Sequence, residues 1–174
     1  MVRRNVNTHG PTIPRCGGRT GHTARYADDM VTVASIPVTQ TMTPQLRAYA
    51  RSYRSGFLNE PFDDDLLAIW HRLLLADVWR IRAAYDDPRP YGLEGEPVAT
   101  FASIAGSLNT GNSLAPANLI ADVTVQASHQ RRGHMRRLMA IDLDEATERG
   151  DVFALLTASD ATIYPRFGFG VATT

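Results

Sequence analysis

The chain has 174 residues, of which 44% are hydrophobic and 21% charged, a composition typical of a globular domain with a substantial core. Its 18 basic residues, all arginines, balance 18 acidic residues, so the net charge of zero argues against a general affinity for nucleic acid or a membrane surface. The single cysteine, Cys16, excludes an internal disulfide and a multi-cysteine zinc site. No apolar run reaches the roughly 18 residues that a membrane span needs, and we expect one cytoplasmic domain without a metal.

The first 29 residues differ from the rest of the chain. They contain five arginines and two aspartates but few large apolar side chains, so they cannot bury enough surface to offset the entropy of ordering. We expect residues 1–29 to be a disordered tail and residues 30–174 to form the folded domain. Two alternatives remain open for the tail: a basic arm that binds nucleic acid, and an arginine-rich organelle presequence.

The folded part begins with a β-forming run at residues 31–36, which predicts the first strand. Thr43 and Pro44 are the residue types preferred at the N-cap and the first position of a helix, so they predict a helix over residues 44–58.

Three aspartates at residues 63–65 precede the apolar run 66–75, and such a cluster raises the question of a metal site. Carboxylates at this position cap a helix and complement its dipole, so we interpret them as the start of a second helix. His71 lies inside this apolar helix without a nearby partner in the sequence, and we interpret it as a partly buried structural histidine.

Three strands are predicted next, at residues 78–85, 97–104 and 119–125. In the first of them, apolar side chains alternate with Arg80 and Arg82, the period-2 pattern of a strand. The third is apolar on both faces, which is typical of a strand buried inside a sheet.

A long amphipathic helix follows the third strand, and Gly150 stands where a helix stop is expected. Its apolar stripe is formed by Met135, Leu138, Met139, Leu143 and Ala146. After it, the sequence predicts a short buried strand at residues 152–156 and a short helix at residues 160–167.

The junction between the third strand and the long helix has the chemistry of an anion site. We place the start of this helix at Gln130. The first amides of a helix lack intrahelical acceptors and carry partial positive charge, and Gly133 lets a ligand approach the backbone closely. Arg131 and Arg132 add charge there, which predicts a cradle for phosphate or pyrophosphate. Neither the P-loop pattern nor the Gly-x-Gly-x-x-Gly fingerprint is present, so the nucleotide folds built on them are disfavoured.

The same junction resembles the acetyl-coenzyme A (acetyl-CoA) signature of the GNAT N-acetyltransferases, in the residues Val123-x-Val125 and Gln130-Arg-Arg-Gly-His-Met135. A later motif, Ile163-Tyr-Pro-Arg-Phe-Gly-Phe-Gly-Val-Ala-Thr173, is similar to the Eis (enhanced intracellular survival) branch of that superfamily. The bulky Met135, where the general motif has a small residue, is in keeping with this branch. The resemblance covers residues 31–174.

This resemblance implies an α/β (α+β) fold of the GNAT acyl-CoA N-acyltransferase type, a mixed central sheet flanked by helices. The predicted order of elements, β-α-α-β-β-β-α-β-α, follows that fold up to its last helix, and the final strands of the fold would be missing. Eis proteins also carry a second GNAT-like domain and a sterol-carrier-like domain, whose terminal carboxylate acts as the base. We therefore expect a truncated N-terminal domain of the Eis type.

The resemblance also implies the site residues. The backbone of the central strand would pair with the pantetheine arm and its thioester, the amides after it would take the pyrophosphate, and two residues after the next strand would line the cofactor. These expected acetyl-CoA-binding residues are Val123, Thr124, Val125, Arg131, Arg132, Gly133, His134, Met135, Arg136, Ser159 and Asp160.

Tyr164 is the expected catalytic residue, because it falls on the tyrosine that serves the Eis family as general acid. A neutral phenol, with a reference pKa of about 10, can protonate a departing thiolate, whose thiol has a reference pKa of about 8.5. The alternative is an aromatic side chain that only packs the end of the helix. Pro165 is expected to keep Tyr164 away from helical backbone angles. His129 and His134 are interpreted as surface histidines beside the cradle.

Three hypotheses of function follow. The first is direct transfer of an acetyl group from acetyl-CoA to an amine, such as an aminoglycoside or a lysine side chain. A homo-oligomer is an assembly that this hypothesis allows. The second is an inactive remnant that binds coenzyme A weakly or not at all and exposes a sheet edge. The third is nucleic-acid binding through Arg131, Arg132, Arg136 and Arg137, which neither aromatic interleaving nor net charge supports. We expect the first, with no nucleic-acid or membrane partner.

Overall fold

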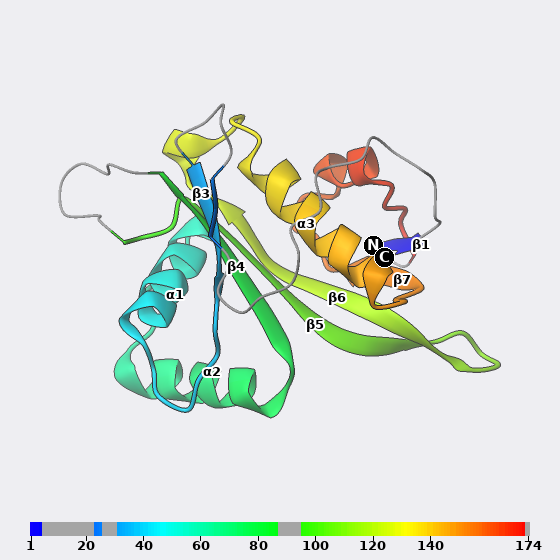
Figure 1. The fold of residues 1–174 in the computed structure, drawn as a ribbon, viewed down its shortest axis with the longest axis horizontal. Helices are drawn as coiled ribbons and strands as arrows, with labels where there is room; N and C mark the ends of the chain where they lie inside the picture. Colours follow the sequence, from blue (N-terminus) through cyan, green and yellow to red (C-terminus); the bar gives the residue numbers. More distant parts are fainter. Residues whose placement is uncertain (5–22, 26–30, 87–94, 173–174) are drawn as a thin grey trace.

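The computed structural model describes residues 1–4, 23–25, 31–86 and 95–172. Its centre is a seven-stranded mixed sheet with the strand order β1-β7-β6-β5-β4-β3-β2 (Figure 1). Neighbouring strands are antiparallel, except that β6 and β7 run parallel. The strands are β1 (Val2–Arg4), β2 (Thr23–Arg25), β3 (Val31–Ile36), β4 (Trp79–Asp86), β5 (Ala99–Asn109), β6 (Leu114–Val125) and β7 (Phe153–Leu156).

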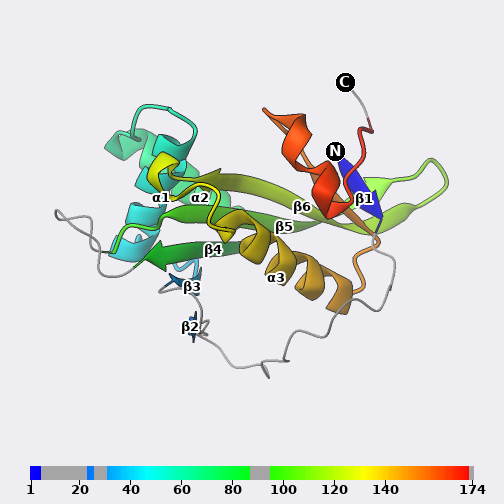
Figure 2. The ribbon, with the colours of Figure 1, turned by 90° about the horizontal axis from the view of Figure 1, so that it is seen from above.

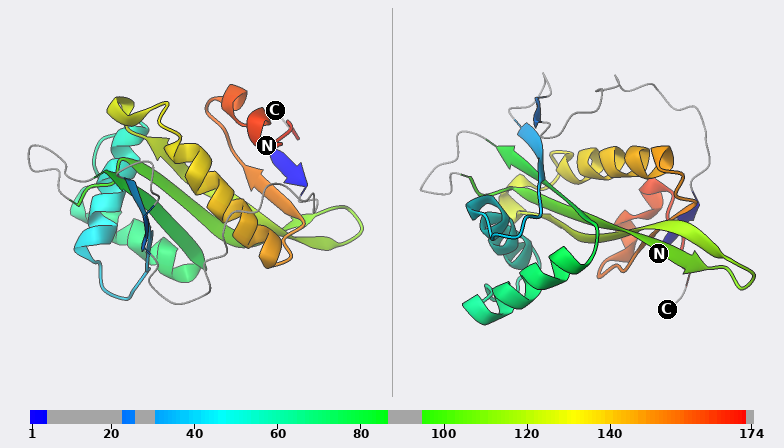
Figure 3. Two further views of the ribbon diagram at one scale, coloured as in Figure 1. Left: turned by 45° about the horizontal axis from the view of Figure 1, so that its top comes forward. Right: turned by 60° about the horizontal axis from the view of Figure 1, so that its bottom comes forward.

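Helices cover both faces of this sheet. Helices α1 (Pro44–Gly56) and α2 (Asp64–Ala76) lie on one face and α3 (His134–Glu148) lies on the other, as Figures 2 and 3 show. Each face has its own apolar core. The α1/α2 side buries Ile36, Leu46, Tyr49, Leu74, Ile81 and Ala83, and the α3 side buries a larger set that includes Phe101, Ile120, Leu138, Met139 and Leu156. The predicted α/β fold and the order of elements from β3 to β7 are confirmed.

The predicted starts of α1 and α2 and the predicted stop of α3 are confirmed, whereas α1 ends at Gly56 and not at residue 58. The side chains of Thr43 and Asp63 accept hydrogen bonds from the third amide of α1 and of α2, at 3.1 and 2.8 Å. Gly150 follows α3 with a φ of 84°, the left-handed conformation that favours glycine at a helix end. His71 is a structural histidine, since it is buried and its Nε2 lies 2.9 Å from the carbonyl oxygen of Thr39.

A buried ionic network joins α3 to the sheet. The predicted strand is confirmed as β4, but residues 81–84 are all buried, because α3 covers the face that carries Arg82. This guanidinium donates to the carboxylate of Asp142 at 2.9 Å and also pairs with Glu145. Asp142, which has no exposed surface, accepts further hydrogen bonds from Ser103 and Asn118. Because every partner is hydrogen-bonded, this network fixes the position of α3 over β4, β5 and β6.

The expected disordered tail contains two strands. Val2 pairs with Leu155 on the outer edge of β7 and exchanges two backbone hydrogen bonds of 2.9 Å with Gly170, while β2 pairs with β3. The expectation of disorder therefore does not hold for residues 2–4 and 23–25. Residues 5–22, with Cys16, and 26–30 lie outside the described residues. Strand β1 covers the outer edge of β7, whereas the remnant hypothesis expects an exposed sheet edge.

The segment after β7 differs from the single short helix that the sequence predicts. It forms two 3₁₀ turns, η2 (Ala161–Ile163) and η3 (Pro165–Phe167), which meet at Tyr164. Tyr164 has right-handed helical angles (φ −84°, ψ −24°), so the expected effect of Pro165 on its backbone is wrong. Its carbonyl oxygen accepts hydrogen bonds from the amides of Phe167 and Phe169, and these bonds outweigh the steric preference of a residue before proline.

Across the described parts of the chain, no helix has the length and apolar character needed to traverse a membrane.

Candidate functional site

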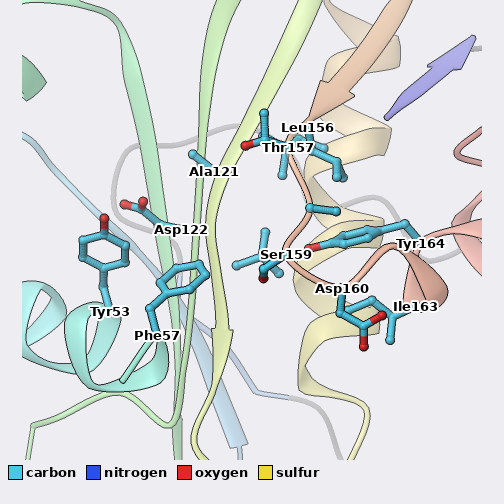
Figure 4. Close-up of a pocket in the computed structure, with 13 residues that line it drawn as sticks. Tyr53, Phe57, Ala121, Asp122, Leu156, Thr157, Ser159, Asp160, Ile163 and Tyr164 are labelled. Carbon is cyan, nitrogen blue, oxygen red and sulfur yellow. The ribbon is translucent and has the colours of Figure 1, made fainter. Parts of the chain in front are cut away.

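The site lies where the two parallel strands separate. Pairing between β6 and β7 ends at Ile120 and Leu156, but β6 continues to Val125. Beyond Ile120, the edge of β6 that faces β7 therefore has no β7 partner in the described chain. A pocket of about 470 Å³ opens at this point (Figure 4). It is lined by Tyr53, Phe57, Ile120, Ala121, Asp122, Val123, Leu156, Thr157, Ala158, Ser159, Asp160, Ile163 and Tyr164.

A β-bulge in β6 places Asp122 in the pocket wall. Ala121 pairs with Ala102 and Thr124 with Thr100, so two residues of β6, Asp122 and Val123, oppose a single residue of β5. Asp122 adopts a φ of 54°, which a side chain with a Cβ rarely takes. The hydroxyl of Thr100 donates to the carbonyl oxygen of Asp122 at 2.7 Å and helps to hold this conformation.

The carboxylate of Asp122 is in an unusual electrostatic environment. Burial raises its pKa to about 6, and the hydroxyl of Tyr49, which donates to it at 3.3 Å, partly opposes this rise. Its negative charge in turn raises the pKa of Tyr53, after the effect of burial. Sequence reasoning missed Asp122; the available signal was an acidic residue inside the otherwise apolar run 119–125.

Aromatic side chains from α1 form the wall beside Asp122. Tyr53 and Phe57 line the pocket and contact each other edge-on, with ring centroids 5.6 Å apart. The end of α1 lies close to β6 because Gly56 has no side chain: a Cβ on this residue would lie 2.4 Å from the Cβ of Thr124. The C-terminal end of α1 and the bulge of β6 are therefore held together by the close contact between Gly56 and Thr124.

The opposite wall carries Tyr164. Its side chain is 7% exposed and packs edge-on against Phe169 at 6.1 Å. Figure 4 shows its hydroxyl pointing toward the space between the walls. Burial, followed by the negative charge of Asp160, raises the pKa of Tyr164, so the phenol keeps its proton at neutral pH. Packing and catalysis are therefore compatible roles for this side chain.

Ser159 and Asp160 also line this wall, as Figure 4 shows. The carboxylate of Asp160 caps η2: it accepts from the amide of Thr162 at 2.9 Å and from its hydroxyl at 2.6 Å. These hydrogen bonds lower the pKa of Asp160 and hold it as an anion.

The predicted cradle lies just beyond the carboxyl end of β6. The first hydrogen bond of α3 runs from the amide of Arg137 to the carbonyl oxygen of Gly133, so the amides of residues 134–136 have no acceptor within the helix. Arg131 and Gly133 have φ values of 64° and 81°. Successive amides in such a turn form a concave, positively polarised surface. The helix begins at His134 and not at Gln130, because η1 (Ala127–His129) and this turn precede it.

Side chains around the cradle differ in exposure. Asp86 holds His129 at 3.1 Å and Arg132 at 3.5 Å, while Arg131 and Arg136 are exposed. His134 is only 2% exposed, so its interpretation as a surface histidine is wrong; the helix start turns it inward. Met135 packs against the core on the α3 side.

The structure brings together some of the predicted site residues. Val123, Ser159, Asp160 and Tyr164 line one pocket. Thr124 is buried with its hydroxyl 2.6 Å from that of Thr100, and Val125 packs against the α3 core. The cradle residues Arg131 to Arg136 lie outside the pocket lining, further along the same strand–helix junction. Within the described residues, no group of three or more His, Cys, Asp or Glu side chains is placed to hold a metal ion.

Comparison with known proteins identifies an acetyltransferase family and relatives named as N-acetyltransferases. The family model described as an acetyltransferase (GNAT) domain matches residues 40–172. An uncharacterised N-acetyltransferase of Streptomyces avermitilis is 40% identical over 126 residues, which cover 72% of this chain and 28% of the relative. The chain thus spans less than a third of the length of this curated relative.

Two solved structures share the fold. A predicted acetyltransferase from Clostridium acetobutylicum, crystallised with acetyl-CoA, has a TM-score of 0.62 at 14% identity and covers 81% of this chain and 90% of its own. An aminoglycoside acetyltransferase from an uncultured soil metagenomic sample, in complex with sisomicin, has a TM-score of 0.57 at 19% identity, with coverages of 79% and 84%.

Proposed function

Since the chain belongs to the GNAT acetyltransferase family, we propose that it transfers an acetyl group from acetyl-CoA to an amine at the pocket between β6 and β7. The observation that carries this proposal is the separation of the two parallel strands directly beside an unused helix N-terminus. An extended arm can add to the free edge of β6, and an anion can sit on the amides at the start of α3.

Binding of acetyl-CoA is assigned to the backbone of two segments. In the segment Val123, Thr124 and Val125, the amide and carbonyl groups that point away from β5 pair with the pantetheine arm at the unpaired edge of β6. The amides of residues 131–136 receive the pyrophosphate, and the exposed guanidiniums of Arg131 and Arg136 add positive charge. Ser159 and Asp160 complete the pocket on the side of β7.

The reaction joins the amine nitrogen to the thioester carbonyl carbon and breaks the carbon–sulfur bond. Tyr164 supplies the proton that the departing thiolate needs, because a phenol inside the pocket remains neutral at physiological pH. Holding donor and acceptor in one pocket supplies the proximity that direct transfer requires. No acyl-enzyme is required by this route.

We assign the chain to the Eis branch and its acceptor to the aminoglycoside or lysine-type amines. The motif at residues 163–173 supports this branch, and two of its residues, Ile163 and Tyr164, line the pocket. The fold shared with an aminoglycoside acetyltransferase supports the acceptor class.

The test is acetyl transfer by the purified chain. Acetyl-CoA is incubated with sisomicin or with a lysine amide, thiol release is followed continuously, and the product is identified by mass spectrometry. The proposal predicts a monoacetylated amine and an equivalent amount of free coenzyme A. Thiol release without an acetylated amine, or no release at all, would contradict it.

A further inference from the structure

We propose that Asp122, Tyr53 and Phe57 form a binding site for the cationic form of the acceptor amine, and that Asp122 removes the proton the amine must lose before it attacks. This inference rests on the proposed acetyl transfer and specifies the acceptor side of the same pocket. The three side chains meet on one wall, opposite Ser159, Asp160 and Tyr164 (Figure 4).

Within the part of the chain that the structure describes, the carboxylate of Asp122 has no cationic partner. Within the described chain, no ion pair involves Asp122, and its one side-chain hydrogen bond comes from the neutral hydroxyl of Tyr49. By contrast, the buried carboxylate of Asp142 is paired with Arg82. A shielded anion that lacks a countercharge attracts a cationic ligand, because binding restores the charge balance lost on burial.

The aromatic rings beside Asp122 favour a cationic ligand as well. Tyr53 and Phe57 line the pocket beside Asp122. Aromatic faces attract ammonium groups, and they exclude water that would otherwise screen the carboxylate. A carboxylate flanked by two aromatic side chains therefore selects amines that are protonated in solution over neutral or anionic acceptors.

The two proton-transfer groups, Asp122 and Tyr164, lie on opposite walls of the pocket. Asp122 projects from the bulge of β6 on the α1 side, whereas Tyr164 projects from the segment after β7. The acceptor can thus approach from the wall of Asp122 while the thiolate leaves beside Tyr164. The strained φ of 54° is consistent with a functional position, since such strain persists only where the surrounding structure imposes it.

The proton balance is complete with these two groups. The ammonium gives one proton to the carboxylate of Asp122, and the free amine forms the carbon–nitrogen bond. As the carbon–sulfur bond breaks, Tyr164 protonates the thiolate. The second proton of the bonded nitrogen passes to the Tyr164 phenolate, and Asp122 releases its proton to water.

This assignment predicts an acid limb in the pH profile. The groups that face Asp122 are Tyr49 and Tyr53 of α1 and Thr100 of β5, with Asp160 and Tyr164 across the pocket. With the pKa of Asp122 raised to about 6, kcat/KM for a cationic amine should fall below that pH as the carboxylate becomes protonated. Tyr49→Phe should move this limb to higher pH, because the lost hydrogen bond favours the ionised form.

The experiment compares Asp122→Asn with the wild-type chain, using sisomicin and a lysine amide as cationic probes and aniline as an amine that is uncharged at neutral pH. Asp122→Asn should lower kcat/KM for the cationic probes by about 10²-fold or more and affect aniline less. Its Kd for acetyl-CoA, measured by calorimetry, should not change. Asp65→Asn, which removes an exposed carboxylate of α2, is the matched control and should retain wild-type kinetics.

The outcomes separate this inference from the proposed function. Loss of activity on cationic amines with intact acetyl-CoA binding, together with the shifted limb of Tyr49→Phe, supports Asp122 as the base. Wild-type kinetics of Asp122→Asn overturn that role and leave acetyl transfer standing. A wild-type chain that acetylates none of the probes, or that does not bind acetyl-CoA, overturns the proposed function and with it this acceptor site. A wild-type chain that acetylates aniline as efficiently as the cationic probes overturns the acceptor site alone.

Discussion

At the scale of single residues, the pocket combines a carboxylate that resists ionisation with a phenol that does the same. Burial raises the pKa of Asp122 to about 6 from its ordinary value of 3.8, so the folded chain binds this proton more tightly than the unfolded chain. Stability from this group is present at low pH and is lost as the pH rises from about 4 to about 6. The carboxylate therefore destabilises the fold at neutral pH, as functional groups often do.

Asp122→Asn should consequently be more stable than the wild type at neutral pH. A shift from 3.8 to about 6 corresponds to a gain of up to about 3 kcal/mol above pH 6, and to little or no gain below pH 4. Urea unfolding of both chains at pH 4 and at pH 8 measures the difference. Equal stability at pH 8 would mean that burial does not raise this pKa.

Tyr164→Phe tests the phenol without removing the ring. The contact with Phe169 and the burial of the ring are retained, so we expect a stability change within about 1 kcal/mol. The kcat for acetyl transfer should fall by about 10²-fold or more, while the Kd of acetyl-CoA stays constant. An unchanged kcat would leave Tyr164 with the packing role alone.

At the scale of elements, the site depends on how closely α1 and α3 approach the sheet. Neither approach was visible in the sequence. The end of α1 lies against Thr124 only because residue 56 is a glycine, and α3 lies over β4 because a buried arginine of the strand meets an aspartate of the helix. Both contacts join residues more than 50 positions apart, so the periodicity within a single segment does not predict them.

Gly56→Ala should disturb the aromatic wall of the pocket. The added methyl group would lie 2.4 Å from the Thr124 side chain, so α1 must shift, and we expect a loss of about 1–3 kcal/mol with a raised KM for the amine. Gly170→Ala is the control, since a methyl group there meets no atom within 4 Å. Thermal unfolding and acetylation kinetics measure both variants. Wild-type values for Gly56→Ala would show that the contact does not position α1.

The ionic network under α3 should behave as a unit. Asp142→Ala leaves Arg82 buried beside only one carboxylate, that of Glu145, and should cost about 3–5 kcal/mol. Combining it with Arg82→Met should recover part of this loss, because no unpaired charge then remains. A double-mutant cycle by urea unfolding gives the coupling energy. Additive losses would contradict a coupled pair.

At the scale of the whole molecule, the order of elements was predictable because it follows from patterns within each segment. Capping residues, the apolar stripe of α3 and the buried run of β6 all gave the correct type of element. The bulge at Asp122, the inward turn of His134 and the strand at residues 2–4 were not predictable, since each depends on pairing with a distant strand or on packing under a helix. For the site, the strand–helix junction and the tyrosine wall were expected, whereas the acceptor wall was missed.

We propose that the start of α3 and the free edge of β6 hold acetyl-CoA. Calorimetric titration of the chain with acetyl-CoA measures this binding directly. Gly133→Trp and Gly150→Trp place the same side chain at the two ends of α3, at φ values of 81° and 84°. Because the backbone strain is matched, only the position relative to the cradle differs. We predict saturable binding to the wild type and to Gly150→Trp, and none to Gly133→Trp. Equal binding by both variants, or no binding by a folded wild-type chain, would contradict an acetyl-CoA site at the start of α3.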